Sequence, residues 1–222
     1  MHPILVYLPG MLKPQTLLLI FLALVSFSWL SSYGLIKNGG ERRTNNSEVF
    51  GLRNPVIAKL PLKAVAAKKF VQQNKYNENI CFFIDMRPSS GQFRFFVYDL
   101  KKDTVRNSGL VTHGNCNENW LEGRKYDNTV GCGCTSLGKY KVGRSYNGRF
   151  GLAYKLYGLE KTNNNAFERF VVLHAHECVP ETPVEDEICQ SNGCPTVSLG
   201  FLQYLKPIID RSSKPVLLWI YD

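Results

Sequence analysis

The 222-residue chain lacks any segment in which a dense run of basic residues is interleaved with aromatic residues, although its formal net charge is +9. The cations are scattered in pairs such as Lys68-Lys69 and Lys101-Lys102, a distribution that is typical of a solvated basic surface. We therefore predict no nucleic-acid partner, whereas the charge still favours an anionic lipid or polymer. Internal repeats are also absent, which excludes a repeat architecture.

No charged residue interrupts residues 16–36, an almost wholly apolar stretch that is closed by Lys37. The stretch is long enough to span a bilayer, and its most apolar part has the length of a signal-peptide core. It lacks a clean small-residue cleavage site, and no nearby cysteine could carry a lipid. We predict that residues 1–37 are a signal peptide or membrane anchor. The remainder is then exported to the periplasm or cell envelope, free or anchored in the inner membrane, and touches the membrane only through this segment.

Seven cysteines are a high and odd number for a chain of this length. In an oxidising compartment up to six of them can pair, whereas in a reducing compartment such a set indicates a metal site. The predicted export favours disulfides, because extracytoplasmic compartments sustain them.

Residues 38–77 are predicted to hold a linker and a short helix. The first part is polar and contains Gly and Asn, which is typical of a linker. Residues 61–71 have helical spacing, and Pro61 suits the first turn of a helix. The apolar side chains of this helix are expected on one packing stripe: Leu62, Val65, Ala66 and Phe70.

From residue 80 the pattern changes to short apolar runs that are separated by turn residues, which predicts strands. We expect strands at residues 80–85, 93–100, 105–112, 137–142, 152–156 and 216–220, the first three forming a meander. Cys81, within the first strand, is expected to be buried and free. A helix is expected at residues 199–210 with Ser198 as its N-cap. Its inward side chains would be Phe201, Leu202, Leu205 and Ile209. These elements predict a mainly β fold with a few helices.

The candidate chemistry begins where the apolar run of residues 170–173 ends. This run predicts a buried strand, so His174 and His176, two residues apart, are expected on one face. Cys194 follows in a turn of small residues. Cysteine is a good nucleophile at neutral pH when an imidazole or helix N-terminus lowers its pKa. We interpret Cys194 as the nucleophile, a histidine as its base, and the backbone around Gly193 as an oxyanion site.

Other interpretations of this cluster remain open. A zinc ion would find suitable ligand types here, although their spacing is not that of a standard zinc motif. The zinc alternative uses His174, His176, Cys178, Cys189 and Cys194. One of the two histidines is expected to be a satisfied core residue. A disulfide at Cys194 would favour a non-enzymatic role, and the alternative is then a non-catalytic cell-wall-binding module.

The same segment resembles the catalytic motif of the murein L,D-transpeptidases of YkuD-like fold, in which a strand ends in histidine and a loop leads to Ser-x-Gly-Cys. The resemblance is carried by VVLHAHECVP, SNGCPTVS, PVLLWIY and residues 135–140. It extends over residues 78–222 and implies an L,D-transpeptidase-like β-sandwich or barrel catalytic domain there. Cys194 lies 18 residues after His176 and 20 after His174. The shorter gap matches the family, so the resemblance makes His176 the base and His174 its neighbour.

The resemblance implies an exported cysteine transpeptidase that needs no cofactor. Cys194 would form a thioester with a peptidoglycan tetrapeptide stem, release D-Ala, and pass the acyl group to an amine, giving a 3-3 crosslink, or to water. Ser191 and Asn192 are expected to position the imidazole or the substrate. The chain departs from the family motif in having Asn192 instead of histidine, and Pro195 and Thr196 instead of an aliphatic residue and arginine.

The cysteines fit such an exported enzyme. Cys178 and Cys189 bracket the loop that precedes the candidate nucleophile and are expected to close it with a disulfide. Cys116 is expected to pair with Cys132 or Cys134, because the latter two are too close in sequence for an easy bridge to each other.

Overall fold

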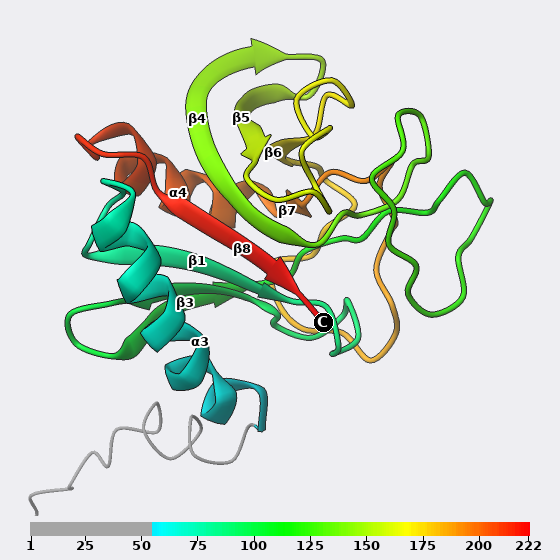
Figure 1. Ribbon diagram of the computed structural model, residues 1–222. Coiled ribbons are helices and arrows are strands. Elements are labelled where there is room, and N and C mark those ends of the chain that lie inside the picture. Colours follow the sequence, from blue (N-terminus) through cyan, green and yellow to red (C-terminus); the bar gives the residue numbers. More distant parts are fainter. Residues whose placement is uncertain (1–54) are drawn as a thin grey trace, which may run out of the picture. The chain divides into compact units, whose positions relative to one another are not determined.

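The computed structural model describes residues 55–222 (Figure 1). The helices are α3 (Pro55–Gln73) and α4 (Leu199–Asp210). The strands are β1 (Ile80–Asp85), β2 (Phe95–Asp99), β3 (Thr104–Gly109), β4 (Gly138–Gly148), β5 (Gly151–Gly158), β6 (Val172–Ala175), β7 (Thr196–Val197) and β8 (Leu217–Tyr221). The predicted hydrophobic segment and most of the predicted linker lie outside the described residues. Within residues 55–222, neither helix is long and apolar enough to cross a membrane.

The strands of the described residues form one mixed sheet in the order β3-β2-β1-β8-β4-β5-β6-β7. Neighbouring strands are antiparallel except for β1 with β8 and β6 with β7. β4 bends strongly, and with β5 it curls over β6 (Figure 1). The predicted mainly β fold with a few helices is confirmed, and β1 to β3 form the expected meander.

β1 is buried at all six positions because both of its faces are covered. Phe82 and Ile84 belong to the core that includes α4, whereas Cys81 and Phe83 belong to the core that includes α3. A strand that is covered on both faces has a continuous apolar sequence and no alternation. Cys81 is buried and free, as expected.

The predicted packing stripe of the first helix is wrong for three of its four residues, since Phe70 alone packs, partly buried, against the core. α3 begins at Pro55, and its buried residues are Leu60, Ala64, Ala67 and Val71. Leu62 and Val65, which were expected to pack, are 76% and 67% exposed. The reason lies in the partner surface, where large rings such as Phe83 already fill the space. Two alanines let the helix axis approach these rings closely.

α4 agrees with the sequence prediction at both ends and on its buried face. Ser198 is the N-cap, and its hydroxyl accepts a hydrogen bond from the Phe201 N–H. The expected side chains are buried: Phe201, Leu202, Leu205 and Ile209. Phe201 packs edge-on against Phe95 of β2, with ring centroids 5.1 Å apart.

The buried strand that was predicted from residue 170 begins two residues later. Phe170 is 83% exposed and has a φ of 56°, and β6 starts at Val172. The N–H of Phe170 donates to the carbonyl of Phe167, so the chain turns here before it enters the sheet. This turn brings the Phe170 carbonyl to the candidate nucleophile.

Candidate active site

One pocket collects most of the residues that the sequence singled out. Its volume is about 220 Å³. Its lining residues are Thr112, Phe150, His174, His176, Cys178, Gln190, Ser191, Asn192, Cys194 and Thr196. The parallel pairing of β6 and β7 sets His174 opposite Thr196, with Cys194 just before β7. The candidate nucleophile, both histidines and both predicted positioning residues therefore share one cavity at the edge of the sheet.

The Cys194 thiol is free and half-buried. Its sulfur accepts a hydrogen bond from the Val172 N–H at 3.4 Å and donates to the Phe170 carbonyl at 3.7 Å. Burial raises the pKa of the thiol, and the Val172 N–H and the charge of Arg169 offset this only in part. The thiol is therefore protonated at neutral pH, so a base must remove its proton before it can attack.

His174 is buried and has the hydrogen bonds of a neutral base. Its Nδ1 lies 3.1 Å from the Ala175 carbonyl, to which it donates, and its Nε2 lies 3.1 Å from the Thr196 hydroxyl. The Nε2 lone pair is therefore directed towards β7. Burial lowers the pKa of His174, so the imidazole is uncharged at neutral pH. The ring stacks on Phe150 with centroids 5.0 Å apart.

His176 has the opposite pattern of hydrogen bonds. Its Nδ1 accepts the Cys178 N–H at 3.1 Å, so in the neutral ring the proton is on Nε2. The ring meets the edge of Phe150 at a centroid distance of 5.5 Å. In this arrangement the Nε2 atom of His176 is a donor, whereas that of His174 is an acceptor.

The backbone carbonyl of Cys194 is held by hydroxyl groups from two segments. Ser191 Oγ donates to it at 2.7 Å, and Thr112 Oγ1 lies 3.2 Å away. The Gly193 N–H donates to Ser191 Oγ, and Pro195 has no N–H. Within residues 55–222 the N–H groups of Asn192 and Cys194 have no acceptor, so the N–H of Cys194 is available as an oxyanion donor. Thr112 was not singled out by the sequence, where it only ends a predicted strand.

Gly193 is required by both conformation and space. Its φ is 100°, and a Cβ there would lie 2.5 Å from the Cys134 carbonyl oxygen. Gly193→Ala is expected to destabilise the fold by about 2–4 kcal/mol and to displace Cys194. Gly123 is a matched control, since its φ is 73° and nothing lies within 4 Å of its Cβ position. Gly123→Ala should cost about 1 kcal/mol in urea unfolding. Equal costs for the two variants would contradict the steric argument.

Two disulfides lie next to the pocket. Cys178 pairs with Cys189 across the loop before the nucleophile, and Cys116 pairs with Cys134, one of its two expected partners. In the Cys178–Cys189 disulfide neither sulfur is a thiolate, so these two residues cannot serve as ligands of the zinc ion considered above. Within residues 55–222, no group of three or more His, Cys, Asp or Glu side chains is arranged to hold a metal ion.

A buried charged cluster that the sequence did not reveal lies against the nucleophile turn. Arg94 is fully buried, and its guanidinium donates to the Val111 carbonyl from Nε at 3.0 Å and from Nη2 at 2.7 Å. It also donates to Pro88 O at 3.2 Å and to His113 Nδ1 at 3.2 Å. Burial lowers the pKa of Arg94 to about 9, so it stays charged at neutral pH.

His113 connects this cluster to the turn. Burial, followed by the charges of Arg124 and Arg94, lowers the pKa of His113 to about 4. Its Nε2 faces the Gln190 amide nitrogen at 3.2 Å, and its carbonyl accepts the Ser191 N–H at 2.9 Å. The segment that precedes Cys194 is thus bonded to His113 through side chain and backbone. The residues of this buried cluster come from segments that are distant in sequence, so no local sequence pattern could have predicted the cluster.

The family model for the L,D-transpeptidase catalytic domain matches residues 55–221. This chain belongs to the L,D-transpeptidase catalytic domain family. The predicted family and fold are confirmed, and membership supports a transpeptidase function on peptidoglycan. No curated protein matches this L,D-transpeptidase domain.

Some solved structures are similar to this chain at low sequence identity. The enzyme from Xylanimonas cellulosilytica has 16% identity and a TM-score of 0.35, over 70% of this chain and 69% of that chain. The enzyme from Mycobacterium smegmatis has 10% identity and a TM-score of 0.40, over 65% and 59% of the two chains. The helical cell shape determining protein Pgp2 from Campylobacter jejuni has 14% identity and a TM-score of 0.39, over 64% and 47%.

Proposed function

We propose that this domain is an exported L,D-transpeptidase that uses Cys194 to form a thioester with peptidoglycan tetrapeptide stems. The observation that carries the proposal is the pocket in which a free, protonated thiol and a neutral histidine lie together. The two disulfides support an oxidising compartment such as the periplasm or cell envelope. The reaction needs no cofactor.

In the first half of the reaction, an imidazole takes the proton of Cys194 Sγ. The sulfur then bonds to the carbonyl carbon that precedes the terminal D-Ala, and the Cys194 N–H stabilises the oxyanion. The C–N bond breaks, D-Ala leaves with the proton from the imidazolium, and the thioester remains. In the second half, an amine of another stem attacks the thioester and loses a proton to the imidazole. The C–S bond breaks, and the sulfur recovers a proton; water in place of the amine gives L,D-carboxypeptidase activity.

The two histidines have different claims to the role of base. The spacing from Cys194 favours His176, whereas the hydrogen bonds favour His174. The Thr196 hydroxyl that donates to His174 Nε2 can turn to the Cys194 carbonyl at 3.4 Å and free the lone pair, whereas the His176 Nδ1 lone pair is held by the backbone N–H of Cys178. Asparagine preserves the Nδ1 hydrogen bond in both places. We expect His174→Asn to lower kcat/KM by about 100-fold or more, and His176→Asn by less than about tenfold. A larger loss of kcat/KM in His176→Asn than in His174→Asn would identify His176 as the base.

The function is tested with the full chain. Incubation with a disaccharide tetrapeptide should release D-Ala, and incubation with a carbapenem should add the mass of one drug molecule to the intact protein. Peptide mapping should place the adduct on Cys194. An absence of both D-Ala release and the adduct would overturn the proposal and leave a non-catalytic wall-binding module.

A further inference from the structure

The hairpin β4–β5 has an unusual charge composition. Residues 138–158 contain five lysines and arginines and no aspartate or glutamate. Lys139 is paired with Glu160 at 2.6 Å. The other four, Lys141, Arg144, Arg149 and Lys155, are in no ion pair within residues 55–222, and we call them the basic hairpin. Their charges are not neutralised by the described part of the chain.

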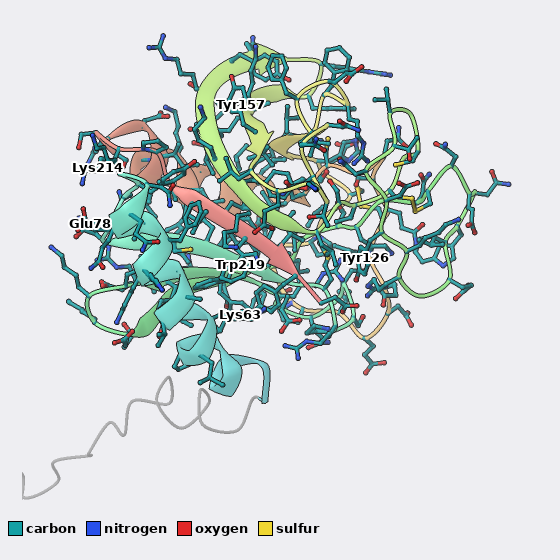
Figure 2. All side chains as sticks on the ribbon, viewed as in Figure 1. Lys63, Glu78, Tyr126, Tyr157, Lys214 and Trp219 are labelled. Carbon is teal, nitrogen blue, oxygen red and sulfur yellow. A yellow bond between two sulfur atoms is a disulfide. The ribbon has the colours of Figure 1, made fainter. Side chains whose placement is uncertain are left out.

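Aromatic rings hold three of these cations in place. The Lys141 ammonium lies 4.5 Å from the centroid of Tyr157, which is labelled on the curved part of the sheet in Figure 2. The Lys155 ammonium lies 5.4 Å from Phe167, and Arg149 lies 5.5 Å from Phe150. Contacts of this kind restrict a flexible cation while leaving its hydrogen-bond donors available to a ligand.

Lys141 and Lys155 of the basic hairpin share a face of the sheet with the candidate active site. Tyr157 pairs with Lys141 on β4, and Lys155 and Ala153 pair with Val172 and His174 on β6. Paired residues in antiparallel strands share a face, as do residues two apart on one strand. The face that carries Lys141 and Lys155 therefore continues to His174, and from there to β7 and Cys194.

A groove of about 940 Å³ runs along part of this hairpin. Its lining includes Lys141, Arg144 and Lys155 from the basic hairpin. The one carboxylate among its lining residues, Asp210, is already used, since it accepts the Tyr154 hydroxyl at 2.9 Å and pairs with Lys206. The groove thus offers cations without competing anions and suits a ligand that carries several carboxylates.

We infer that the basic hairpin docks a polymeric peptidoglycan strand through the carboxylates of stems that neighbour the reacting one. The inference rests on the proposed function, and it adds that the domain prefers polymeric peptidoglycan to soluble fragments. Every tetrapeptide stem ends in a free carboxylate, so a strand presents these groups in series. Because the face is continuous with the pocket, a strand bound there keeps one stem near Cys194. The contacts of neighbouring stems then add to those of the reacting stem.

The test compares Lys141→Glu/Lys155→Glu with Lys101→Glu/Lys102→Glu in the full chain carrying Cys194→Ala. Lys101 and Lys102 are exposed after β2, so the control makes the same charge change away from the groove. Co-sedimentation with insoluble, tetrapeptide-rich peptidoglycan is measured at several salt concentrations. We expect the hairpin variant to bind about tenfold more weakly and the control to bind like the parent. Blocking the peptidoglycan carboxylates as amides should weaken binding of the parent to the level of the hairpin variant.

The same substitutions in the active chain give a second readout. The ratio of kcat/KM for D-Ala release from polymer to that from soluble disaccharide tetrapeptide should fall about tenfold in the hairpin variant. Parent-like binding and an unchanged ratio would overturn the inference, as would an equal loss in the control, which would indicate net charge alone. Binding of the parent to vesicles of anionic phospholipid but not to peptidoglycan would also overturn it. A parent that releases no D-Ala from either substrate would refute the proposed function, while the sedimentation comparison would still decide on docking.

Discussion

Cys194→Ala is expected to reduce D-Ala release from a disaccharide tetrapeptide by about 1000-fold or more, to the level of background. The thiol is the one free cysteine among the residues that line the pocket, and it lies beside two imidazoles, whereas the hydroxyls of Ser191 and Thr112 donate to the Cys194 carbonyl. The variant removes one sulfur atom from a tightly packed turn, so the fold should persist. Circular dichroism and thermal unfolding would check this.

Cys132→Ala is the matched control for that experiment. Cys132 is also a free cysteine, of similar intermediate exposure, but it does not line the pocket. We expect this variant to retain full activity and to bind a carbapenem as the parent does. If Cys194→Ala keeps its activity, or if Cys132→Ala loses activity while Cys194→Ala does not, then Cys194 is not the nucleophile.

Arg94→Ala is expected to destabilise the domain by about 3–5 kcal/mol in urea unfolding. The substitution leaves a cavity in place of a fully buried side chain, strips the Val111 carbonyl of both its guanidinium donors, and leaves the Pro88 carbonyl with Arg124 alone. Unsatisfied buried carbonyls are costly because they have already lost water. Since Val111 also bridges to Val197 of β7, activity should fall even where the variant remains folded.

Two variants separate the effect of Arg94 from a general effect of arginine removal. Arg144→Ala removes an exposed guanidinium that makes no ion pair within residues 55–222, and it should change stability by less than about 0.5 kcal/mol. Arg94→Lys keeps the charge but loses the planar fork, so it should recover only part of the stability. A full recovery by lysine would mean that the charge matters and the geometry does not.

The sequence predicted those elements whose environment is simple. β1 was found with its observed bounds because an unbroken apolar run is what burial on both faces requires. α4 was found because its four buried side chains follow helical spacing and Ser198 caps the first turn. The grouping of Cys194 with His174 and His176 could be predicted because all three lie within one short segment, and the structure places them in one pocket.

Other features depend on partners that are distant in sequence. The face of α3 was misassigned because large residues such as Leu62 gave a stronger apolar signal than the alanines that pack. The turn at Phe170, which delays the start of β6 to Val172, was missed because an apolar run looks the same in a turn and in a strand. The buried cluster of Arg94 and His113 that supports the turn before Cys194 was also missed. The two residues lie far apart in sequence, and neither stands in a local pattern that indicates their contact.

The order of the strands determines when the sheet can be completed during folding. β8, the last strand in sequence among those described, lies between β1 and β4, pairing with the first in parallel and with the second antiparallel. Before residues 217–221 are available, β1 to β3 and β4 to β7 have no strand to join them. Such long-range pairing makes folding slow and places it after the synthesis of residues 217–221. A chain that lacked these residues would carry Cys194 and its two histidines on strands that no central strand joins to β1.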